Sequence, residues 1–403
     1  MNGSHKRLKC FPVLLALSLA GVLASCSSTT PSGSGATPSG TPIKIGIVGT
    51  FQAPSFAFPE VQTVALAFAK KVNQTGGLRG RPVDIVVCND QFDPNVAASC
   101  ARQMVSANVV AVVPGAEGYG NNLIPILANS GIPYVGGSPS EPADYTSPVA
   151  FPIDGGTYGD NIALGDYMAK NSCKKGGGVD IAGAPASALV VSVFQKALQA
   201  NGSSLVATAG IAFNAPDVSA AVATLTSAGA QCVVLSLDPA DAQKVVTAIG
   251  QSGHQVPIGA EWPQLTPYLA NPSTAPNGLL TVQTNEVYGV NQSQGLTTYG
   301  KFISQYAPSV NPSLVWAENT YVAMSVVTGA IGQIPSGKGV TAATVLNQLK
   351  HTTSADTGGI APKVDFTKQF SVSGYNRLFG RVAQIYEIEN GRIVYRQSID
   401  VTP

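Results

Sequence analysis

Residues 43–73 read IKIGIVGTFQAPSFAFPEVQTVALAFAKKVN, and this stretch decides the fold class. Its first seven residues are a short apolar run rich in Ile and Val, which is typical of a buried strand. From Glu60 to Asn73 the apolar residues follow at helical spacing, at Val61, Val64, Ala65 and Phe68. A buried strand followed by such a helix is the repeating unit of α/β folds with parallel sheets.

The same alternation recurs on the C-terminal side of this unit. We expect strands at 83–88, 109–113 and 132–136, with helices at 94–106 and 121–129. It restarts after Phe151 with a helix at 158–171 and strands at 179–182, 204–213, 232–237, 256–259 and 279–284, separated by helices such as 186–199 and 240–251. Helices at 296–306 and 313–331 and a hairpin turning at Asn390-Gly391 follow. The sequence predicts an α/β protein with two doubly wound parallel-sheet lobes, and the roughly 360 residues after position 42 are enough for two cores.

The N-terminus has the pattern of a secretory signal. Lys6, Arg7 and Lys9 precede an apolar run over 11–24, which is too short to span a bilayer. Residues 23–26, Leu-Ala-Ser-Cys, resemble the bacterial lipobox, in which the Cys becomes the first mature residue and carries acyl chains. We therefore expect a signal peptide over 1–25 and a lipidated Cys26 that anchors the protein to a membrane, followed to position 42 by a flexible linker. The alternative is an ordinary signal with an incidental Cys.

The charge balance argues against a nucleic-acid partner. The chain has 23 basic and 22 acidic residues, and removing residues 1–25 takes away three cations and no acids, which leaves 20 against 22. A nucleic-acid-binding protein needs a basic face. No such partner is expected.

The loops at the predicted strand ends carry acids without cations. Open parallel sheets bind ligands at the carboxyl ends of their strands. No Lys or Arg occurs at 103–169 or at 245–300. The acids of these loops are Glu60, Asp90, Asp93, Glu117, Glu141, Asp144, Asp217, Asp238, Asp241, Glu261 and Glu286. Helix capping explains some of them, such as Asp93. The absence of cations nevertheless argues against a phosphate or dicarboxylate ligand and favours a neutral, zwitterionic or cationic one.

Catalytic, metal and cofactor signatures are weak in this chain. The mature sequence has two histidines, His254 and His351, and neither lies at metal-ligand spacing. Residues 332–339 nearly match a phosphate-binding loop, but Gly339 stands where Ser or Thr should hold magnesium. We expect no enzyme activity, no metal and no cofactor.

Four cysteines remain after Cys26, and three disulfide connectivities are possible. Cys88 ends a predicted strand and Cys100 lies on the next helix, so Cys88 with Cys100 and Cys173 with Cys232 is the favoured pairing. Buried free thiols are the alternative.

Four stretches resemble the type I periplasmic binding proteins of the branched-chain amino acid (Leu/Ile/Val) family: IKIGIVGTF, VNQTGGLRGRPVDIVVCNDQFDP, GIPYVGGSPSEP and VPIGAEW. These proteins are substrate-capturing partners of ABC importers. The resemblance implies two lobes joined by three crossovers, near Phe151, Glu286 and Ile360. Lobe 1 would comprise 43–151 and 286–360, and lobe 2 would comprise 152–285 and 361–403.

The resemblance also implies a set of ligand-binding residues. Ser138 and Ser140 match the segment that holds an amino acid's ammonium and carboxylate, and Glu261 matches the acid that pairs with the ammonium. Departures from the family pattern are Asp238, where an aromatic is common, and Glu117 with Tyr119, which replace a carboxylate-binding Ser. An acid at 117 would repel a ligand carboxylate. Aromatic residues near these loops are expected to form an apolar wall of the ligand pocket, with packing in the core or hinge as the alternative. They are Phe51, Phe56, Phe58, Tyr119, Tyr158 and Trp262.

The expected function is capture without chemistry. An extracytoplasmic, lipid-anchored monomer would close on a small solute and present it to an ABC permease and ATPase. Ligand-driven closure requires tighter binding to the closed state. A sensor that feeds a membrane receptor would have the same sequence, and an enzyme on this scaffold is the third possibility.

Overall fold

The structure is a computed structural model that describes residues 37–53 and 57–402. The predicted signal peptide, Cys26 and Phe56 lie outside the described residues. No helix in the described part of the chain is both long enough and apolar enough to cross a membrane.

The first sheet is built from the N-terminal strands. Its strand order is β2-β1-β3-β4-β5, and all neighbours are parallel. The order is that of a doubly wound sheet, in which the strand order reverses between β1 and β3. The strands are β1 (Ile43–Gly49), β2 (Val83–Asn89), β3 (Ala111–Pro114), β4 (Tyr134–Val135) and β5 (Ala150–Phe151). The helices between them are α1 (Pro59–Gln74), α2 (Pro94–Ser106), α3 (Gly120–Asn129) and α4 (Pro142–Thr146).

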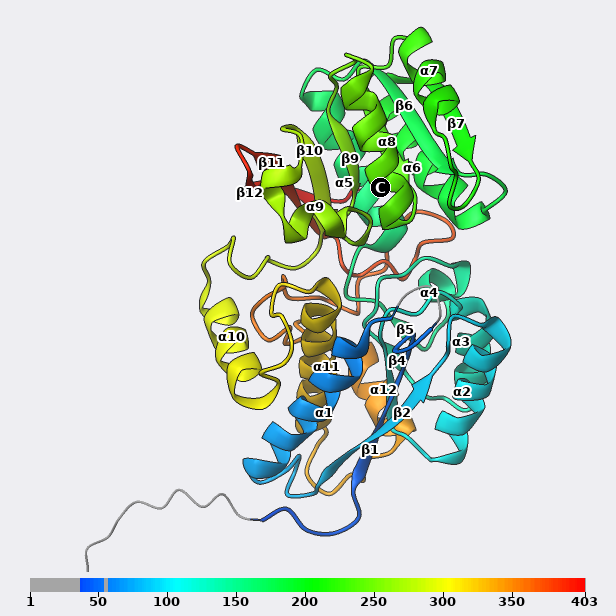
Figure 1. Ribbon diagram of the computed structural model, residues 1–403. Helices are drawn as coiled ribbons and strands as arrows, with labels where there is room; N and C mark the ends of the chain where they lie inside the picture. The colour runs from blue at the N-terminus through cyan, green and yellow to red at the C-terminus, as the bar shows by residue number, and fades with distance from the viewer. Residues whose placement is uncertain (1–36, 54–56, 403) are drawn as a thin grey trace, which may run out of the picture. The chain divides into compact units, whose positions relative to one another are not determined.

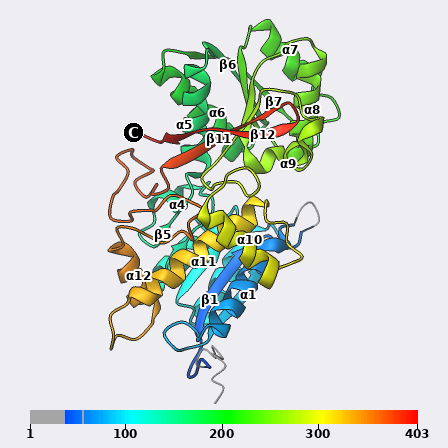
Figure 2. The same ribbon diagram turned by 90° about the vertical axis from the view of Figure 1, so that its left-hand side faces the viewer.

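Helices cover both faces of this sheet, as Figure 1 shows for α1 and α11 on one side and α2 and α3 on the other. Alternate residues of β1 point to opposite faces. Ile45 and Ile47 pack with α1, while Val48 packs with α2 and α3. The face with α1 is completed by three late helices, α10 (Gln294–Tyr306), α11 (Val315–Gln333) and α12 (Ala342–Lys350). Figure 2 shows these yellow and orange helices beside the blue N-terminal elements.

The second sheet repeats the same design. Its order is β12-β11-β10-β9-β8-β6-β7. Within it, the order β7-β6-β8-β9-β10 corresponds to the order β2-β1-β3-β4-β5 of the first sheet. An antiparallel hairpin, β11–β12, extends it at the β10 edge. The hairpin turns at Asn390 and Gly391, whose φ values of 50° and 71° are those of a two-residue turn with the expected Asn-Gly sequence. The strands are β6 (Lys175–Ile181), β7 (Ser204–Ile211), β8 (Cys232–Ser236), β9 (Ile258–Glu261), β10 (Leu279–Gln283), β11 (Val382–Glu389) and β12 (Arg392–Asp400).

Helices again pack on both faces of the second sheet. Val234 and Val282 face α5 and α6, whereas Val233 and Leu235 face α7 and α8. The helices are α5 (Gly156–Lys170), α6 (Pro185–Ala200), α7 (Ser219–Ser227), α8 (Pro239–Gln251) and α9 (Thr266–Ala270), with short 3-10 turns η1 (Trp262–Leu265) and η2 (Pro272–Thr274). The α/β fold with two doubly wound sheets is therefore confirmed.

The chain passes between the two sheets three times, after β5, after β10 and after α12. These crossings contact one another. The backbone N–H of Gly155 donates to Thr284 Oγ1 over 3.0 Å, and that of Glu286 donates to the carbonyl of Ile360 over 2.8 Å. The crossings lie near the three predicted positions, while the lobe boundaries stated above stay predictions.

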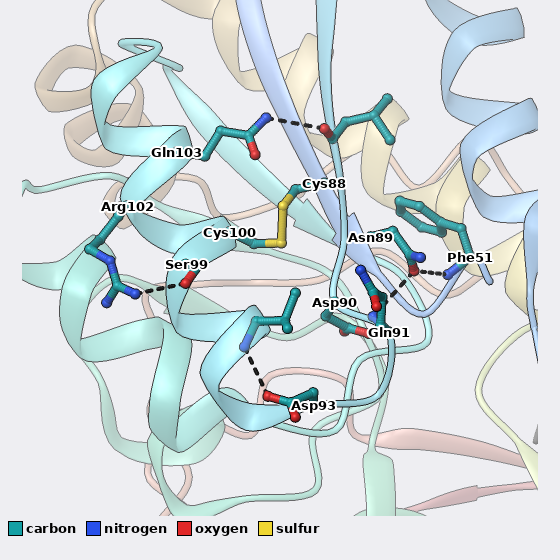
Figure 3. Close-up of a disulfide and its surroundings, with 12 residues drawn as sticks. Phe51, Cys88, Asn89, Asp90, Gln91, Asp93, Ser99, Cys100, Arg102 and Gln103 are labelled. Carbon is teal, nitrogen blue, oxygen red and sulfur yellow. Dashed lines mark hydrogen bonds between the residues drawn. A yellow bond between two sulfur atoms is a disulfide. The ribbon is translucent and has the colours of Figure 1, made fainter. Parts of the chain in front are cut away.

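Two disulfides fasten elements within the lobes. Cys88 on β2 bonds Cys100 on α2, with 5.5 Å between the Cα atoms (Figure 3). Cys173, which follows α5, bonds Cys232 at the start of β8. This is the pairing that the sequence favoured. From the 12- and 59-residue separations, the disulfides stabilise the folded chain by about 3 and about 4 kcal/mol.

Candidate functional site

Asp90, directly after β2, organises the loops that follow the first two strands. It is fully buried and accepts hydrogen bonds from Thr50 Oγ1 (2.6 Å) and from the backbone N–H of Phe92 (2.9 Å). The neighbouring Asn89 accepts from the backbone N–H of Phe51 at 2.9 Å (Figure 3). Burial raises the pKa of Asp90. Its Oδ2 atom has no hydrogen-bond partner among the described residues.

Glu117, in the loop after β3, and Tyr134, the first residue of β4, form a hydrogen-bonded pair. The Tyr134 hydroxyl donates to Glu117 Oε2 over 2.6 Å, and the backbone N–H of Tyr119 donates to Glu117 Oε1. Burial, with the nearby charge of Asp144, raises the pKa of Glu117 to about 8 against the effect of these hydrogen bonds. Glu117 is therefore largely protonated at neutral pH. A ligand-binding role for Glu117 and its repulsion of a ligand carboxylate stay predictions.

Ser138 and Ser140 lie in the loop after β4, and both are partly exposed. Ser138 lines a cavity of about 10 Å³ together with Glu117, Tyr134 and Asp144. That volume is close to the minimum for one water molecule. The backbone N–H of Ser140 donates to Asp144 Oδ2 at 3.1 Å, and burial raises the pKa of Asp144 to about 6.

The loop that carries the two serines is fixed to the start of α5. The carbonyl of Pro139 accepts from the Tyr145 hydroxyl (2.6 Å) and from the backbone N–H of Thr157 (3.0 Å). The Tyr145 hydroxyl also accepts from the backbone N–H of Tyr158 at 3.2 Å. The serine loop of the first sheet and the first turn of α5 are thereby held together.

A second group of polar residues lies where β5, α5 and β9 end or begin. Asp154 accepts from the backbone N–H of Gly156 at 2.6 Å and from Ser138 Oγ at 3.4 Å. On α5, Asn161 Nδ2 donates to Glu261 Oε1 at 2.7 Å. Asp160, 4% exposed, lies beside Asn161 in the chain.

Burial raises the pKa of all three carboxyl groups in this group, and repulsion by neighbouring acids adds to this effect for Asp160 and Glu261. Burial raises the pKa of Asp154 to about 6 and that of Glu261 to about 7, the latter with help from the charge of Asp154 and against the Asn161 hydrogen bond. The pKa of Asp160 lies well above its usual value because of burial and the charges of Asp154 and Glu261. None of the described ion pairs includes these three residues.

The other predicted site residues make separate contacts. Asp238 caps α8, accepting from the backbone N–H groups of Ala240 (3.0 Å) and Asp241 (3.2 Å). The Tyr119 hydroxyl donates to the carbonyl of Phe92 at 3.0 Å. Trp262 is 5% exposed and packs against Tyr386, so it belongs to a core cluster. A ligand-binding role for Asp238 and Tyr119 stays a prediction.

Ser138 is thus hydrogen-bonded to Asp154. Asp154 lies close enough to Glu261 for its charge to raise the pKa of Glu261. Asp154, Asp160 and Asn161 were not among the residues expected from the sequence. The signal that indicates them is the long stretch without Lys or Arg at 103–169, which contains all three.

The described residues contain no group of three or more His, Cys, Asp or Glu side chains that could hold a metal ion. The polar group at the crossings has three carboxyl groups and no Lys or Arg partner among the ion pairs of the described residues. Such an arrangement fits a ligand that brings donors or positive charge.

Two doubly wound lobes joined by three crossings, with polar residues at their strand ends, define the class of two-lobed α/β binding proteins. Residues 42–385 match the periplasmic binding protein family, so the chain belongs to that family. Its members are extracytoplasmic solute-binding proteins.

Solved structures of similar fold belong to the same class. A leucine-binding protein from Thermotoga maritima is 14% identical with a TM-score of 0.71, and the match covers 89% of this chain and 99% of that one. An ABC transporter substrate-binding protein from Desulfitobacterium hafniense in complex with Leu is 16% identical with a TM-score of 0.70, covering 88% and 100%. A solute-binding protein from R. palustris in complex with 4-hydroxybenzoate is 14% identical with a TM-score of 0.73, covering 90% and 98%. The TM-scores show that the fold is shared. No curated protein sequence matches the chain.

Proposed function

We propose that this chain is the solute-binding lipoprotein of an ABC importer and captures a small zwitterionic, neutral or cationic solute by hinge closure. The observation that carries the choice of ligand is the group of Asp154, Asp160 and Glu261, which has no Lys or Arg partner among the described residues. Carboxyl groups in low-dielectric surroundings favour ligands that supply positive charge or hydrogen-bond donors.

In this proposal Glu261 pairs with a cationic group of the ligand, and Ser138 and Ser140 bind its polar atoms. Glu261, at the end of β9, is a partly exposed residue. Ser138 and Ser140 are likewise partly exposed at the end of β4. Residues from both sheets would then contact the same solute, so that closure buries it. The ligand drives closure only by binding the closed form more tightly than the open one.

A ligand screen tests the proposed solute class. The full chain, purified in detergent, is heated with amino acids, amides, amines, dicarboxylates and phosphate esters, and compounds that raise the melting temperature are measured by calorimetry. We expect a member of the first three groups to bind most tightly, because a bound ligand stabilises the folded state. A phosphate ester or dicarboxylate as the tightest ligand would contradict the proposal.

The transport role and the anchor need separate measurements. Uptake of the labelled ligand by cells with and without the gene distinguishes an importer component from a sensor, because a sensor leaves uptake unchanged. Mass spectrometry of the mature N-terminus tests acylation at Cys26. The Cys26→Ala variant should leave the membrane fraction, since stable anchoring depends on the acyl chains.

A further inference from the structure

Asp160 and Asn161 place two unsatisfied acceptors in the group at the crossings. Asp160 Oδ1 and Asn161 Oδ1 are both buried, and neither has a hydrogen-bond partner among residues 37–53 and 57–402. Asp160 is 4% exposed and Asn161 is fully buried. A buried acceptor without a partner is unfavourable, so two adjacent ones favour a ligand that supplies hydrogen-bond donors.

The orientation of the Asn161 amide is fixed by its neighbours. Asn161 Nδ2 donates to the carbonyl of Thr157 (2.8 Å) and to Glu261 Oε1 (2.7 Å), which uses both of its hydrogens. The reversed amide would set its oxygen against two acceptors. Asn161 Oδ1 therefore remains an acceptor, and the missing partner must be a donor.

The charges around these atoms have the same sign. Asp154 and Glu261 are the charged neighbours that act on Asp160, and both are acids. One cationic group bound at Glu261 would leave Asp154 and Asp160 without a charge partner, so these two carboxyl groups would stay protonated, as the direction of their pKa indicates. A second cationic group would let them ionise as paired charges. A metal ion does not meet the need, because the described residues form no group suited to holding one.

We propose that Asp160, Asp154 and Asn161 form a second cation subsite beside Glu261, so that the preferred ligand carries two cationic nitrogen groups. This inference rests on the proposed function, in which Glu261 binds the first cationic group. N–H donors of the second group satisfy Asp160 Oδ1 and Asn161 Oδ1, and its charge offsets those of the two aspartates. The chemical class is a small diamine or a basic amino acid.

Matched probes test the second subsite. Calorimetry on the full chain compares 1,4-diaminobutane with 1-aminobutane and lysine with norleucine, two pairs that differ chiefly in the second amine. We expect the dicationic member of at least one pair to bind more than ten times as tightly as its partner. In Asp160→Asn, which keeps the side-chain size, this ratio should fall toward one, and Asp154→Asn should also reduce it.

A control variant comes from the same helix. Asp166 on α5 pairs with Lys170 at 2.7 Å and takes no part in the group, so Asp166→Asn should keep the wild-type ratio. Circular dichroism and melting temperature show whether each variant folds. If Asp160→Asn weakens both members of a pair equally, Asp160 has a structural role and the inference fails.

The remaining outcomes separate this inference from the proposed function. Equal binding of the two members of each pair, or no binding of any of the four probes, overturns the second subsite. If a neutral amide or an amino acid with a neutral side chain binds tightly in the wider screen, the proposed function stands without the second cation subsite. If a phosphate ester binds most tightly, both fail.

Discussion

Glu261 is the residue on which the proposed ligand chemistry depends most directly. Its Oε1 atom accepts from Asn161, which leaves Oε2 for a ligand. Glu261→Ala removes the paired charge, so ligand affinity should fall more than about tenfold, or 1.4 kcal/mol. Calorimetry with the tightest ligand of the screen measures the change.

A distant acid supplies the control for this prediction. Glu389 on β11 pairs with Arg396 at 3.1 Å and is exposed, so Glu389→Ala should leave the affinity unchanged. Unchanged affinity in Glu261→Ala as well would remove Glu261 from the site.

Arg377 is a single residue that joins the last crossing to β5. It is 8% exposed, and its Nε donates to the carbonyl of Ala150 at 2.6 Å. Its guanidinium lies 4.6 Å from the ring centre of Phe151 and 4.9 Å from that of Phe379. Arg377→Met loses a charged hydrogen bond and two cation–π contacts, so the free energy of unfolding should fall by about 2–4 kcal/mol.

Urea unfolding of two single variants, Arg377→Met and Arg381→Met, checks this prediction. Arg381 also donates to backbone carbonyls, of Leu378 (3.1 Å) and Lys368 (2.6 Å), but it is more exposed. Its replacement should therefore cost less. An equal or smaller loss for Arg377→Met would show that burying its charge offsets its contacts.

At the level of elements, the first turn of α8 depends on Asp238. Its Oδ1 accepts from two backbone N–H groups of that turn. Asp238→Ala should lower the free energy of unfolding by about 1 kcal/mol, whereas Asp238→Asn should keep most of the stability because Asn is an equally good N-cap. Urea unfolding of both variants measures the difference.

Asp93 provides a matched cap in the other lobe. It accepts from the backbone N–H groups of Asn95 (2.7 Å) and Val96 (3.0 Å) at the start of α2, so Asp93→Ala should cost a similar amount. If Asp238→Asn were as unstable as Asp238→Ala, the negative charge and not the cap would be the stabilising feature.

The elements also show where sequence patterns suffice. Helix α2 and strand β1 have the predicted bounds, because each buries a regular apolar pattern. Strand β6 was expected at 179–182 but begins at Lys175, since three glycines at its start hide it from a propensity argument. A Cβ at Gly176 would lie 2.3 Å from Leu198, and one at Gly178 would lie 2.6 Å from Val191. Close packing of α6 therefore requires these glycines.

Helix α7 was expected only in general terms, as a helix between two strands, and helix α12 was missed. Helix α12 buries only Val345 and Leu349, so its apolar pattern is too sparse to recognise, although Thr341 and Thr344 form a capping box at its start. The carboxyl group of Asp160 was missed because its burial depends on contacts between elements far apart in the chain. Glu261 was predicted from the sequence through the family resemblance, whereas its hydrogen-bond partner Asn161 was identified only from the structure.

For the whole molecule, the buried carboxyl groups predict an unusual pH dependence of stability. Burial raises the pKa of Asp144 and Asp154 to about 6, of Glu261 to about 7, and of Glu117 and Glu318 to about 8. In the unfolded chain these groups titrate near 4. Between about pH 4 and pH 8 the native state therefore binds more protons than the unfolded state, and the free energy of unfolding falls as pH rises.

Urea unfolding of the ligand-free chain at pH 5, 6.5 and 8 measures this slope. We expect a loss of more than about 1.4 kcal/mol between pH 5 and 8, which corresponds to one pKa unit of one group. The groups with lowered pKa, Asp217, Asp241 and Asp365, act below about pH 4 and do not change the sign in this window.

Glu318 provides a test of this slope outside the candidate site. It is 1% exposed on α11, and its Oε1 accepts from the backbone N–H of Tyr288 at 3.1 Å. Glu318→Gln keeps an acceptor there and removes the titrating group, so the loss of stability from pH 5 to 8 should become smaller. Stability that rose with pH in the wild-type chain would mean that these carboxyl groups are ionised and compensated in the native state. The second cation subsite would then lose its electrostatic basis, because the aspartates would need no partner from the ligand.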